Sequence, residues 1–351
     1  MFQLLIKKLA YGILVLAGVV VVVFFIFQAF GDPARMVMGQ TGDKKTMDNI
    51  RKELYLDQPK WKQFIFYVND ISPLSIDTKE EIKEKGLHGF FMKIGGKEEI
   101  GIKIPYLRRS YQTKKPVTEV LMEALPGTIM LACAAMFFAI IVGIFLGILA
   151  AVKQNTWMDT SSVFASVIGI SAPSFFMAIV IAYIFGLVLH DYTGLSLTGS
   201  WFNIDQVTGK RYLTLQNLIL PALTLGIRPL SIITQLTRSS MLDTLNQDYI
   251  RTAYAKGLSK RKVIFDHALR NAINPVLTAI TGWFAELLAG AFFVEYIFGW
   301  KGIGKVTVDA LEKLDYPVVM GSVLFAATIF VLVNILADIL YGVIDPRVKM
   351  I

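Results

Sequence analysis

The stretch LPGTIMLACAAMFFAIIVGIFLGILAAV, residues 125–152, decides the fold class of this chain. It carries no charged residue, and it is longer than the ~20 residues that a helix needs to cross the hydrocarbon core of a bilayer. In lipid a helix satisfies its own backbone hydrogen bonds, so a single continuous stretch of this kind forms a helix and not a strand. The sequence therefore predicts a transmembrane helix here.

Six windows, this one included, are long and apolar enough to span a membrane. They cover roughly residues 9–30, 125–152, 161–189, 215–239, 274–298 and 318–344. Of the 351 residues 54% are hydrophobic, which is too high for an ordinary soluble domain. We expect an all-α, polytopic membrane helix bundle of six transmembrane helices.

Lysine and arginine predict the orientation of the bundle. Lys7 and Lys8 precede the first window, and a dense set of basic residues fills 238–270 between the fourth and fifth windows. Basic residues favour the cytoplasmic side, and an even number of spans places both termini together. We expect both termini in the cytoplasm, an uncleaved first helix over 1–30 and an extracytoplasmic loop over 31–117. The net charge of +8 then reflects these loops and their contact with membrane lipid, and not nucleic-acid binding.

The long outer loop mixes lysine with acidic residues. Its middle, 71–105, contains IDTKEEIKEKGLHG, which predicts a short charged helix ended by Gly86. The loop is either a small folded cap or only a solvated insert, and we expect a partly folded cap. Its small core would come from four aromatic residues, Trp61, Phe64, Phe66 and Tyr67.

Proline and glycine interrupt several of the apolar windows. Pro173 lies inside the third window, and Pro221 and Pro229 lie in the fourth. Each removes a backbone hydrogen bond and allows a kink. Gly143 and Gly147 form a small-residue face on the second helix, which indicates close helix packing.

The segment DYIRTAYAKGLSKRKVIFDHALRNAINP, residues 248–275, is basic and lies between two apolar windows. A helix is expected over Tyr249–Lys256, ended by Gly257 in a left-handed conformation. A second helix follows from Lys260 to about Asn271, with Ser259 at its start. Pro275 would then open the next span.

Composition leaves two interpretations of this segment open. A stiff helix joined to the spans by a glycine suits force transfer between a cytoplasmic partner and the membrane. A basic interfacial helix bound to anionic headgroups has the same composition.

The residues of this segment carry a resemblance. RTAYAKG followed by HALRNAINP is similar to the coupling-loop (EAA) motif of ABC importer permeases, most closely in their peptide subfamily. The matching positions are Arg251, Thr252, Ala253, Gly257, His267, Ala268, Arg270, Asn271 and Pro275. The wider importer pattern has Glu-Ala-Ala where this chain has Arg251-Thr252-Ala253, a departure that fits the peptide branch.

Other segments resemble the same family in the same order. They are GDPAR at 31–35, LDQPKWKQF at 56–64, LRRSYQTKKPVTEVLMEALPGT at 107–128, LILPALTLG at 218–226, LTRSSML at 236–242, FGWKGIGK at 298–305, DYPVVMG at 315–321 and DPR at 345–347. The region 71–105 looks like an insertion. Residues 118–351 would then form a five-helix permease core of the type I importer kind, with a cytoplasmic coupling loop at 240–272.

The resemblance implies a permease subunit of an ATP-driven importer in the bacterial cytoplasmic (inner) membrane. Its implied partners are a second homologous permease, two ATP-binding subunits and an extracytoplasmic substrate-binding protein. The implied cargo is an oligopeptide or dipeptide, with nickel chelates, glutathione or opines as alternatives. The residues implied in ATPase coupling are Tyr249, Arg251, Thr252, Ala253, Gly257, His267, Arg270 and Asn271. The subunit itself would need no cofactor and have no catalytic residue.

Competing functions find less support in the residues. GWKGIGKVT at 299–307 approaches a phosphate-binding loop, but Val306 stands where that motif has Ser or Thr. The three histidines are far apart, which argues against a metal site. An ion-coupled secondary transporter would show internal repeats, and none is visible.

Charged residues inside the apolar windows are the candidates for a translocation path. Arg228 and Glu286 lie on the fourth and fifth windows at comparable distances from the loop between them. A central charge is costly in a membrane, so each should face protein or water. Either the two pair, or Arg228 faces a cavity and attracts a peptide carboxylate. Asp338 is expected to anchor packing, and Glu295, near an outer boundary, is expected to be wet.

Overall fold

The computed structural model describes residues 2–29, 51, 55–204, 209, 211–289 and 291–344. GDPAR at 31–35 and DPR at 345–347 lie outside these residues. The chain forms two compact units, each described by itself. One contains residues 1–8, 125–305 and 329–351, and the other contains residues 9–124 and 306–328.

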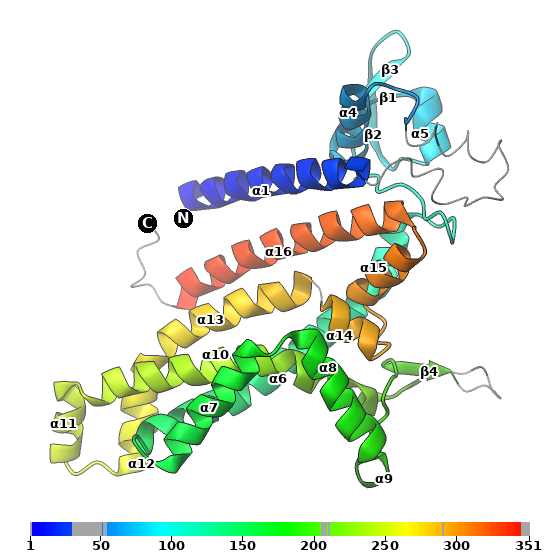
Figure 1. The fold of residues 1–351 in the computed structure, drawn as a ribbon. Helices are drawn as coiled ribbons and strands as arrows, with labels where there is room; N and C mark the ends of the chain where they lie inside the picture. The colour runs from blue at the N-terminus through cyan, green and yellow to red at the C-terminus, as the bar shows by residue number, and fades with distance from the viewer. Residues whose placement is uncertain are drawn as a thin grey trace. The chain divides into compact units, whose positions relative to one another are not determined.

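The all-α membrane class is confirmed. Within the described residues, five helical stretches are long and apolar enough to span a membrane, or six when one bent pair counts as a span. The long helices are α1 (Phe2–Ala29), α6 (Val117–Val152), α10 (Ile219–Leu245), α13 (Arg270–Ala289) and α16 (Tyr316–Ile344). The bent pair is α7 (Trp157–Ser171) and α8 (Ser174–Tyr183), the latter continued by the π-helical η1 (Ile184–Val188). Figure 1 shows these elements.

Shorter elements connect the long helices (Figure 1). After η1 come α9 (His190–Thr193), the paired strands β4 (Phe202–Ile204) and β5 (Arg211–Leu213), and the 3₁₀ turn η2 (Leu215–Leu218). Between α10 and α13 lie α11 (Asp248–Ala255), α12 (Lys260–Lys262) and the π-helical η3 (Val263–Leu269). Before α16 lie α14 (Phe292–Ile297) and α15 (Ile303–Glu312).

The third window, expected to be one kinked helix over 161–189, is instead broken. Helices α7 and α8 meet at an angle of 110°. Ala172 is extended, with φ −74° and ψ 130°, because the ring of a following proline disfavours helical geometry at the residue before it. Pro173 also lacks the N–H that would continue α7. The prediction of one continuous helix over this window is therefore wrong.

The fifth window, expected over 274–298, also has different bounds. Helix α13 ends at Ala289, and α14 is a separate short helix. Pro275 does not open the span. It lies inside α13, which follows α12 and η3 without a break from Lys260. Hydropathy alone could not separate α14 from α13, because both are apolar.

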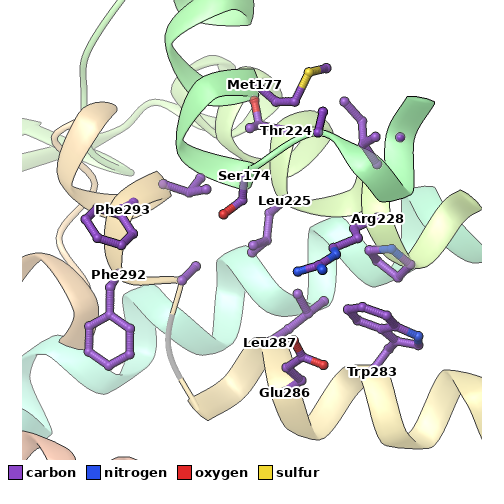
Figure 2. A pocket seen from close by; sticks show the side chains of 16 residues that line it. Ser174, Met177, Thr224, Leu225, Arg228, Trp283, Glu286, Leu287, Phe292 and Phe293 are labelled. Carbon is purple, nitrogen blue, oxygen red and sulfur yellow. The ribbon is translucent and has the colours of Figure 1, made fainter. Parts of the chain in front are cut away.

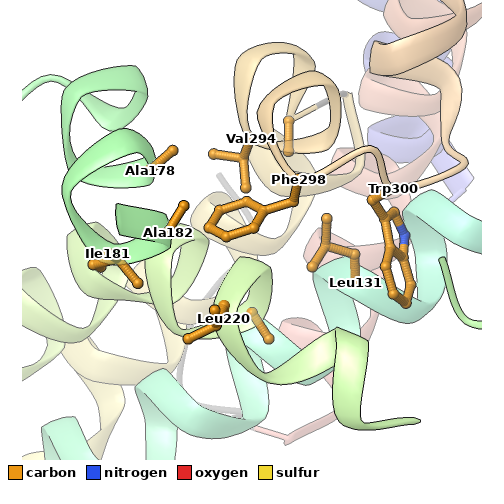
Figure 3. Packing of buried hydrophobic residues seen from close by; sticks show 10 residues of the cluster. Leu131, Ala178, Ile181, Ala182, Leu220, Val294, Phe298 and Trp300 are labelled. Carbon is orange, nitrogen blue, oxygen red and sulfur yellow. The ribbon is translucent and has the colours of Figure 1, made fainter. Parts of the chain in front are cut away.

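A buried apolar cluster joins the start of α6 to the segments around α14 (Figure 3). Trp300 and Phe298 have exposed fractions of 0% and 1% and pack with Leu131 of α6 and Leu220 of α10. The Trp300 indole Nε1 donates a 2.9 Å hydrogen bond to the carbonyl oxygen of Gly127. The stretch 298–305 is therefore a packed part of the bundle and not a free loop.

The expected close packing at the second helix is confirmed between α6 and α10. A Cβ atom on Gly147 would lie 2.5 Å from the Cβ of Thr237, and one on Gly143 would lie 2.9 Å from Ile233 Cγ2. The two helix backbones approach so closely only because these positions have no side chain.

Gly147→Ala should therefore lower the free energy of unfolding by about 1–3 kcal/mol, since the added methyl group forces the helices apart. Gly18→Ala is the matched control. No atom lies within 4 Å of a Cβ there, so the higher helix propensity of alanine should leave stability equal or better. Unfolding by SDS in detergent micelles measures both variants. Equal effects at the two positions would contradict the packing.

The described part of the loop between α1 and α6, expected to be the outer loop, folds around a small antiparallel sheet. Helix α4 (Lys60–Ile71) precedes β1 (Leu74–Thr78), α5 (Lys79–Lys85), β2 (Gly89–Gly95) and β3 (Glu98–Lys103), and the strand order is β1-β3-β2. The expected charged helix is α5. Gly86 ends it with φ 65°, and Thr78 and Glu81 form a capping box at its start. The strands were not predicted.

The interior of this folded region is ionic. An aromatic core that includes Trp61 was expected, but this is wrong because Trp61 is 61% exposed. Tyr67 is buried, but it packs with Phe24 of α1. The buried carboxylates are Asp70 and Asp77, and their ion-pair partners are Lys85, Lys103 and Arg108. Burial acts to lower the pKa of the Lys85 ammonium, but the adjacent Asp70 carboxylate outweighs it and the pKa is raised.

Candidate functional site

The segment after α10 folds as one packed unit at the end of that helix (Figure 1). Helix α11 buries Ile250 and Ala253 against Met241 of α10 and against Val263 and Ile264 of η3. The expected left-handed residue is confirmed, since Gly257 has φ +78°. Because its inner face is buried, α11 is held firmly to α10 and η3.

The opposite face of α11 is open. Tyr249 and Tyr254 have exposed fractions of 43% and 44%. Arg251 is also exposed, and it lies 3.6 Å from the carboxylate of Asp248 in an exposed pair that contributes little stability. A rigid helix with two tyrosines and an arginine on its free face has the composition of a protein contact.

The structure places the eight predicted coupling residues on both faces of this unit. Those that are exposed are Tyr249, Arg251, Thr252, Gly257, Arg270 and Asn271. His267 is half-buried and Ala253 is buried, so Ala253 contributes packing. Ser259 stands at the start of α12 as expected, but its hydroxyl makes no capping hydrogen bond. The π-helical geometry of η3 was not predicted.

A pocket of about 160 Å³ lies where the α7–α8 break meets α10, α13 and α14 (Figure 2). Arg228 of α10 lines it, together with Trp283 and Glu286 of α13. The guanidinium carbon of Arg228 lies 5.8 Å from the centroid of the Trp283 ring, which is the geometry of a cation–π contact. Ser174, the first residue of α8, lies at the same pocket.

Arg228 and Glu286 share this pocket without pairing. Among the residues that the structure describes, neither has an ion-pair partner within 4 Å, and both side chains are exposed in the isolated chain. Of the two alternatives drawn from the sequence, the structure does not show the Arg228–Glu286 pair. Two charges of opposite sign are left facing one cavity.

Asp159 and Arg238 form an ion pair that sequence reasoning missed. Arg238 Nε donates to Asp159 Oδ1 at 2.5 Å, and its NH2 group donates to Oδ2 at 2.9 Å. This bidentate pair ties the start of α7 to α10, two turns before the end of α10 at Leu245. Asp159 has an exposed fraction of 4% and also accepts a hydrogen bond from the backbone N–H of Asn155.

Glu295, expected to be wet, is fully buried. Its carboxylate accepts hydrogen bonds from Thr128 Oγ1 at 2.8 Å and from the backbone N–H groups of Gly304 and Lys305 at 2.7 and 3.2 Å. Burial raises the pKa of this carboxyl to about 7, although the three hydrogen bonds act in the opposite direction.

The position of Glu295 also explains the near match to a phosphate-binding loop. The first backbone N–H groups of α15, where such a loop would hold a phosphate, already bind the Glu295 carboxylate. Asp338, which lies within α16, forms an ion pair with Lys8.

Family models match two parts of the chain. Residues 143–350 match the binding-protein-dependent transport system inner membrane component, and residues 1–81 match the N-terminal part of such components. The chain belongs to this family. It is a multi-pass component of an inner membrane transport system.

Curated relatives extend the likeness over the full chain. A protein of Alkalihalophilus pseudofirmus named dipeptide transport system permease protein DppB is 35% identical over 98% of both chains. The protein of the same name from Escherichia coli K12 is 35% identical over 99% of both. A di/tripeptide transport system permease protein of Pseudomonas aeruginosa is 33% identical over 99% of both.

A solved structure supports the fold. The chain resembles a chain of the MetNI methionine ABC transporter in an inward-facing conformation, with a TM-score of 0.51 and 14% identity. The match covers 65% of this chain and 97% of that one. At this identity the likeness concerns the fold alone, and it agrees with an importer permease bundle.

Proposed function

We propose that this chain is one permease subunit of an ATP-driven importer that moves oligopeptides or dipeptides across the cytoplasmic membrane. The observation that carries the proposal is the 35% identity over nearly the whole chain to permeases of dipeptide transport systems. The subunit conducts its cargo and performs no covalent step, and ATP is hydrolysed in separate subunits.

The exposed face of α11 is the proposed docking surface for those ATP-binding subunits. Tyr249, Arg251 and Tyr254 are exposed, and the buried Ile250 and Ala253 keep the helix from shifting alone. With this loop and both termini in the cytoplasm, the folded outer loop faces the substrate-binding protein. A second permease of the same family completes the path.

A movement of α11 can be transmitted to the pocket through α10. Helix α10 runs without a break from Ile219 to Leu245, and it carries Arg228 at the pocket and Arg238 near α11. Because α11 packs on the end of α10, a pull on the docked face moves α10, and the Asp159–Arg238 pair takes α7 with it. The α7–α8 break at the pocket is thus displaced by an event at the cytoplasmic face.

Co-purification tests the docking surface. The tagged chain is expressed with its genomic neighbours and solubilised in mild detergent, and we expect two ATP-binding subunits to accompany it. Gly257→Pro should release them, because proline cannot adopt the φ of +78° found there. Tyr249→Ala should weaken retention by tenfold or more, because exposed tyrosines are among the residues that contribute most to protein contacts.

Tyr192→Ala is the matched control, since Tyr192 is 89% exposed on α9 and should leave retention unchanged. The proposal fails if no ATP-binding subunit accompanies the wild-type chain. In proteoliposomes, ATP-dependent uptake of a dipeptide, compared with nickel chelates, glutathione and opines, identifies the cargo.

A further inference from the structure

We propose that the pocket at the α7–α8 break binds both charged ends of a short zwitterionic peptide, with the carboxylate at Arg228 and the amino group at Glu286. The inference rests on the proposed function, because it names the chemistry by which that importer's path holds its cargo. It starts from two opposite charges that line one cavity and do not pair with each other.

Arg228 is positioned to bind an anion. Its guanidinium carbon lies 5.8 Å from the centroid of the Trp283 ring, and no described residue accepts a hydrogen bond from it. A cation–π contact uses none of the guanidinium N–H groups, and their fork matches the two oxygens of a carboxylate. Trp283 therefore fixes the orientation of Arg228 without neutralising its charge.

The start of α8 adds to the attraction for an anion at the same pocket. The break at Pro173 makes Ser174 the first residue of a ten-residue helix, and Ser174 lines the cavity. The N–H groups of a helix's first turn lack helical partners and carry partial positive charge. In membrane transporters, interrupted helices of this kind supply their N-termini to anionic groups of the substrate.

Glu286 supplies the opposite charge. It lies one turn after Trp283 on the same face of α13 and lines the cavity, and none of the residues that the structure describes forms an ion pair with it. A carboxylate within an apolar span faces protein, water or a counter-charge. Pro229 cannot donate to the carbonyl of Leu225, so the regular helical hydrogen bond is missing there, and both residues line the same pocket.

Because one positive and one negative side chain line the cavity, the pocket favours a ligand that carries both charges. A ligand with only a carboxylate is attracted by Arg228 but repelled by Glu286, and a ligand with only an amine meets the reverse. A zwitterion satisfies both. The cavity of about 160 Å³ is smaller than the ~300–1,000 Å³ of sites for drug-sized ligands, which suits a dipeptide.

The test compares three probes in proteoliposomes that contain the complete importer: dialanine, dialanine amide and N-acetyl-dialanine. For each protein the measured quantity is the ATP-dependent uptake of each blocked peptide relative to dialanine. We expect Arg228→Gln to lower dialanine uptake about tenfold. This variant should no longer discriminate against dialanine amide, which has no carboxylate, but should still discriminate against N-acetyl-dialanine. Glu286→Gln should no longer discriminate against N-acetyl-dialanine, which has no free amino group, but should still discriminate against dialanine amide.

Controls separate the pocket from other causes. Arg109→Gln and Glu84→Gln remove exposed charges in the outer loop and should keep wild-type ratios. Arg228→Lys keeps the charge and should retain part of the preference for the free carboxylate, which an unfolded variant would not. Unchanged ratios in both pocket variants would show that selection lies elsewhere and would overturn the inference while leaving the importer intact. Absence of ATP-dependent uptake of all three probes by the wild type would overturn both proposals.

Discussion

Replacing Glu295 with alanine should lower the free energy of unfolding by about 3–5 kcal/mol. The substitution leaves three buried donors without an acceptor: the Thr128 hydroxyl and the backbone N–H groups of Gly304 and Lys305. These bonds connect α6, α14 and the start of α15, so their loss loosens three elements at once. SDS titration of the purified protein in detergent measures the effect.

Glu295→Gln is the matched control. Its amide oxygen can still accept from Gly304 and Lys305, and the Thr128 hydroxyl can turn to accept from the amide nitrogen, so we expect a loss below about 1.5 kcal/mol. An alanine variant as stable as the glutamine variant would show that the three donors find other acceptors.

The same pair of proteins gives a pH dependence with a defined sign. The carboxyl of Glu295 has a pKa of about 7 when folded and an ordinary value of 4.5 when exposed, so between these values the folded state binds more protons than the unfolded state. The contribution of this group to the free energy of unfolding is therefore largest below about pH 4.5, falls as the pH rises and is lost above about pH 7. The difference between wild type and Glu295→Gln should follow this course, and a flat difference between pH 5 and 8 would contradict it.

Local rules predicted α11 and its end well, because these depend on neighbouring residues. Gly257 ends α11 with positive φ, as a glycine after a short helix should. Hydropathy likewise predicted the long helices, since crossing lipid imposes one solution on any long apolar run. What local rules could not give is which face of α11 is buried, because that depends on Met241 and Val263.

The outer strands were missed although they alternate with period two. In β1 and β3 the exposed positions hold Ile76, Ile100 and Ile102, while the buried ones hold Asp77 and Lys103. Alternation is normally interpreted as apolar residues inside, and here the polar side is inside, held by ion pairs. The charges that left a solvated insert open as an alternative are the ones that organise this region.

The other features that could not be predicted from the sequence depend on contacts between residues that are distant in the chain. Glu295 seemed exposed because only its place near the end of a window was considered, and its partners at Thr128 and Gly304 lie on other elements. Arg228 and Glu286 were placed at one level by counting from the loop, which was enough to bring them to one pocket. It was not enough to reveal the Trp283 contact, which depends on the rotation of α13 about its axis.

Breaking the Asp159–Arg238 pair should have the other large effect. Asp159→Ala leaves a half-buried guanidinium without its bidentate acceptor and removes the acceptor for the Asn155 N–H, so we expect a loss of about 3–5 kcal/mol in the free energy of unfolding. Asp243→Ala is the matched control, because Asp243 is exposed on α10 close to Arg238 and should change stability by less than about 0.5 kcal/mol.

A double-mutant cycle shows whether the pair acts as a unit. If Arg238 and Asp159 stabilise each other, the Asp159→Ala/Arg238→Ala protein should be more stable than the sum of the single losses predicts, by about 2–3 kcal/mol. Strictly additive losses would mean that each side chain acts through other contacts. Because the pair joins α7 to the helix that leads into α11, the double variant should also hydrolyse ATP in the assembled importer with less peptide moved per ATP. A stable double variant with wild-type uptake per ATP would show that α7 follows α10 through packing alone.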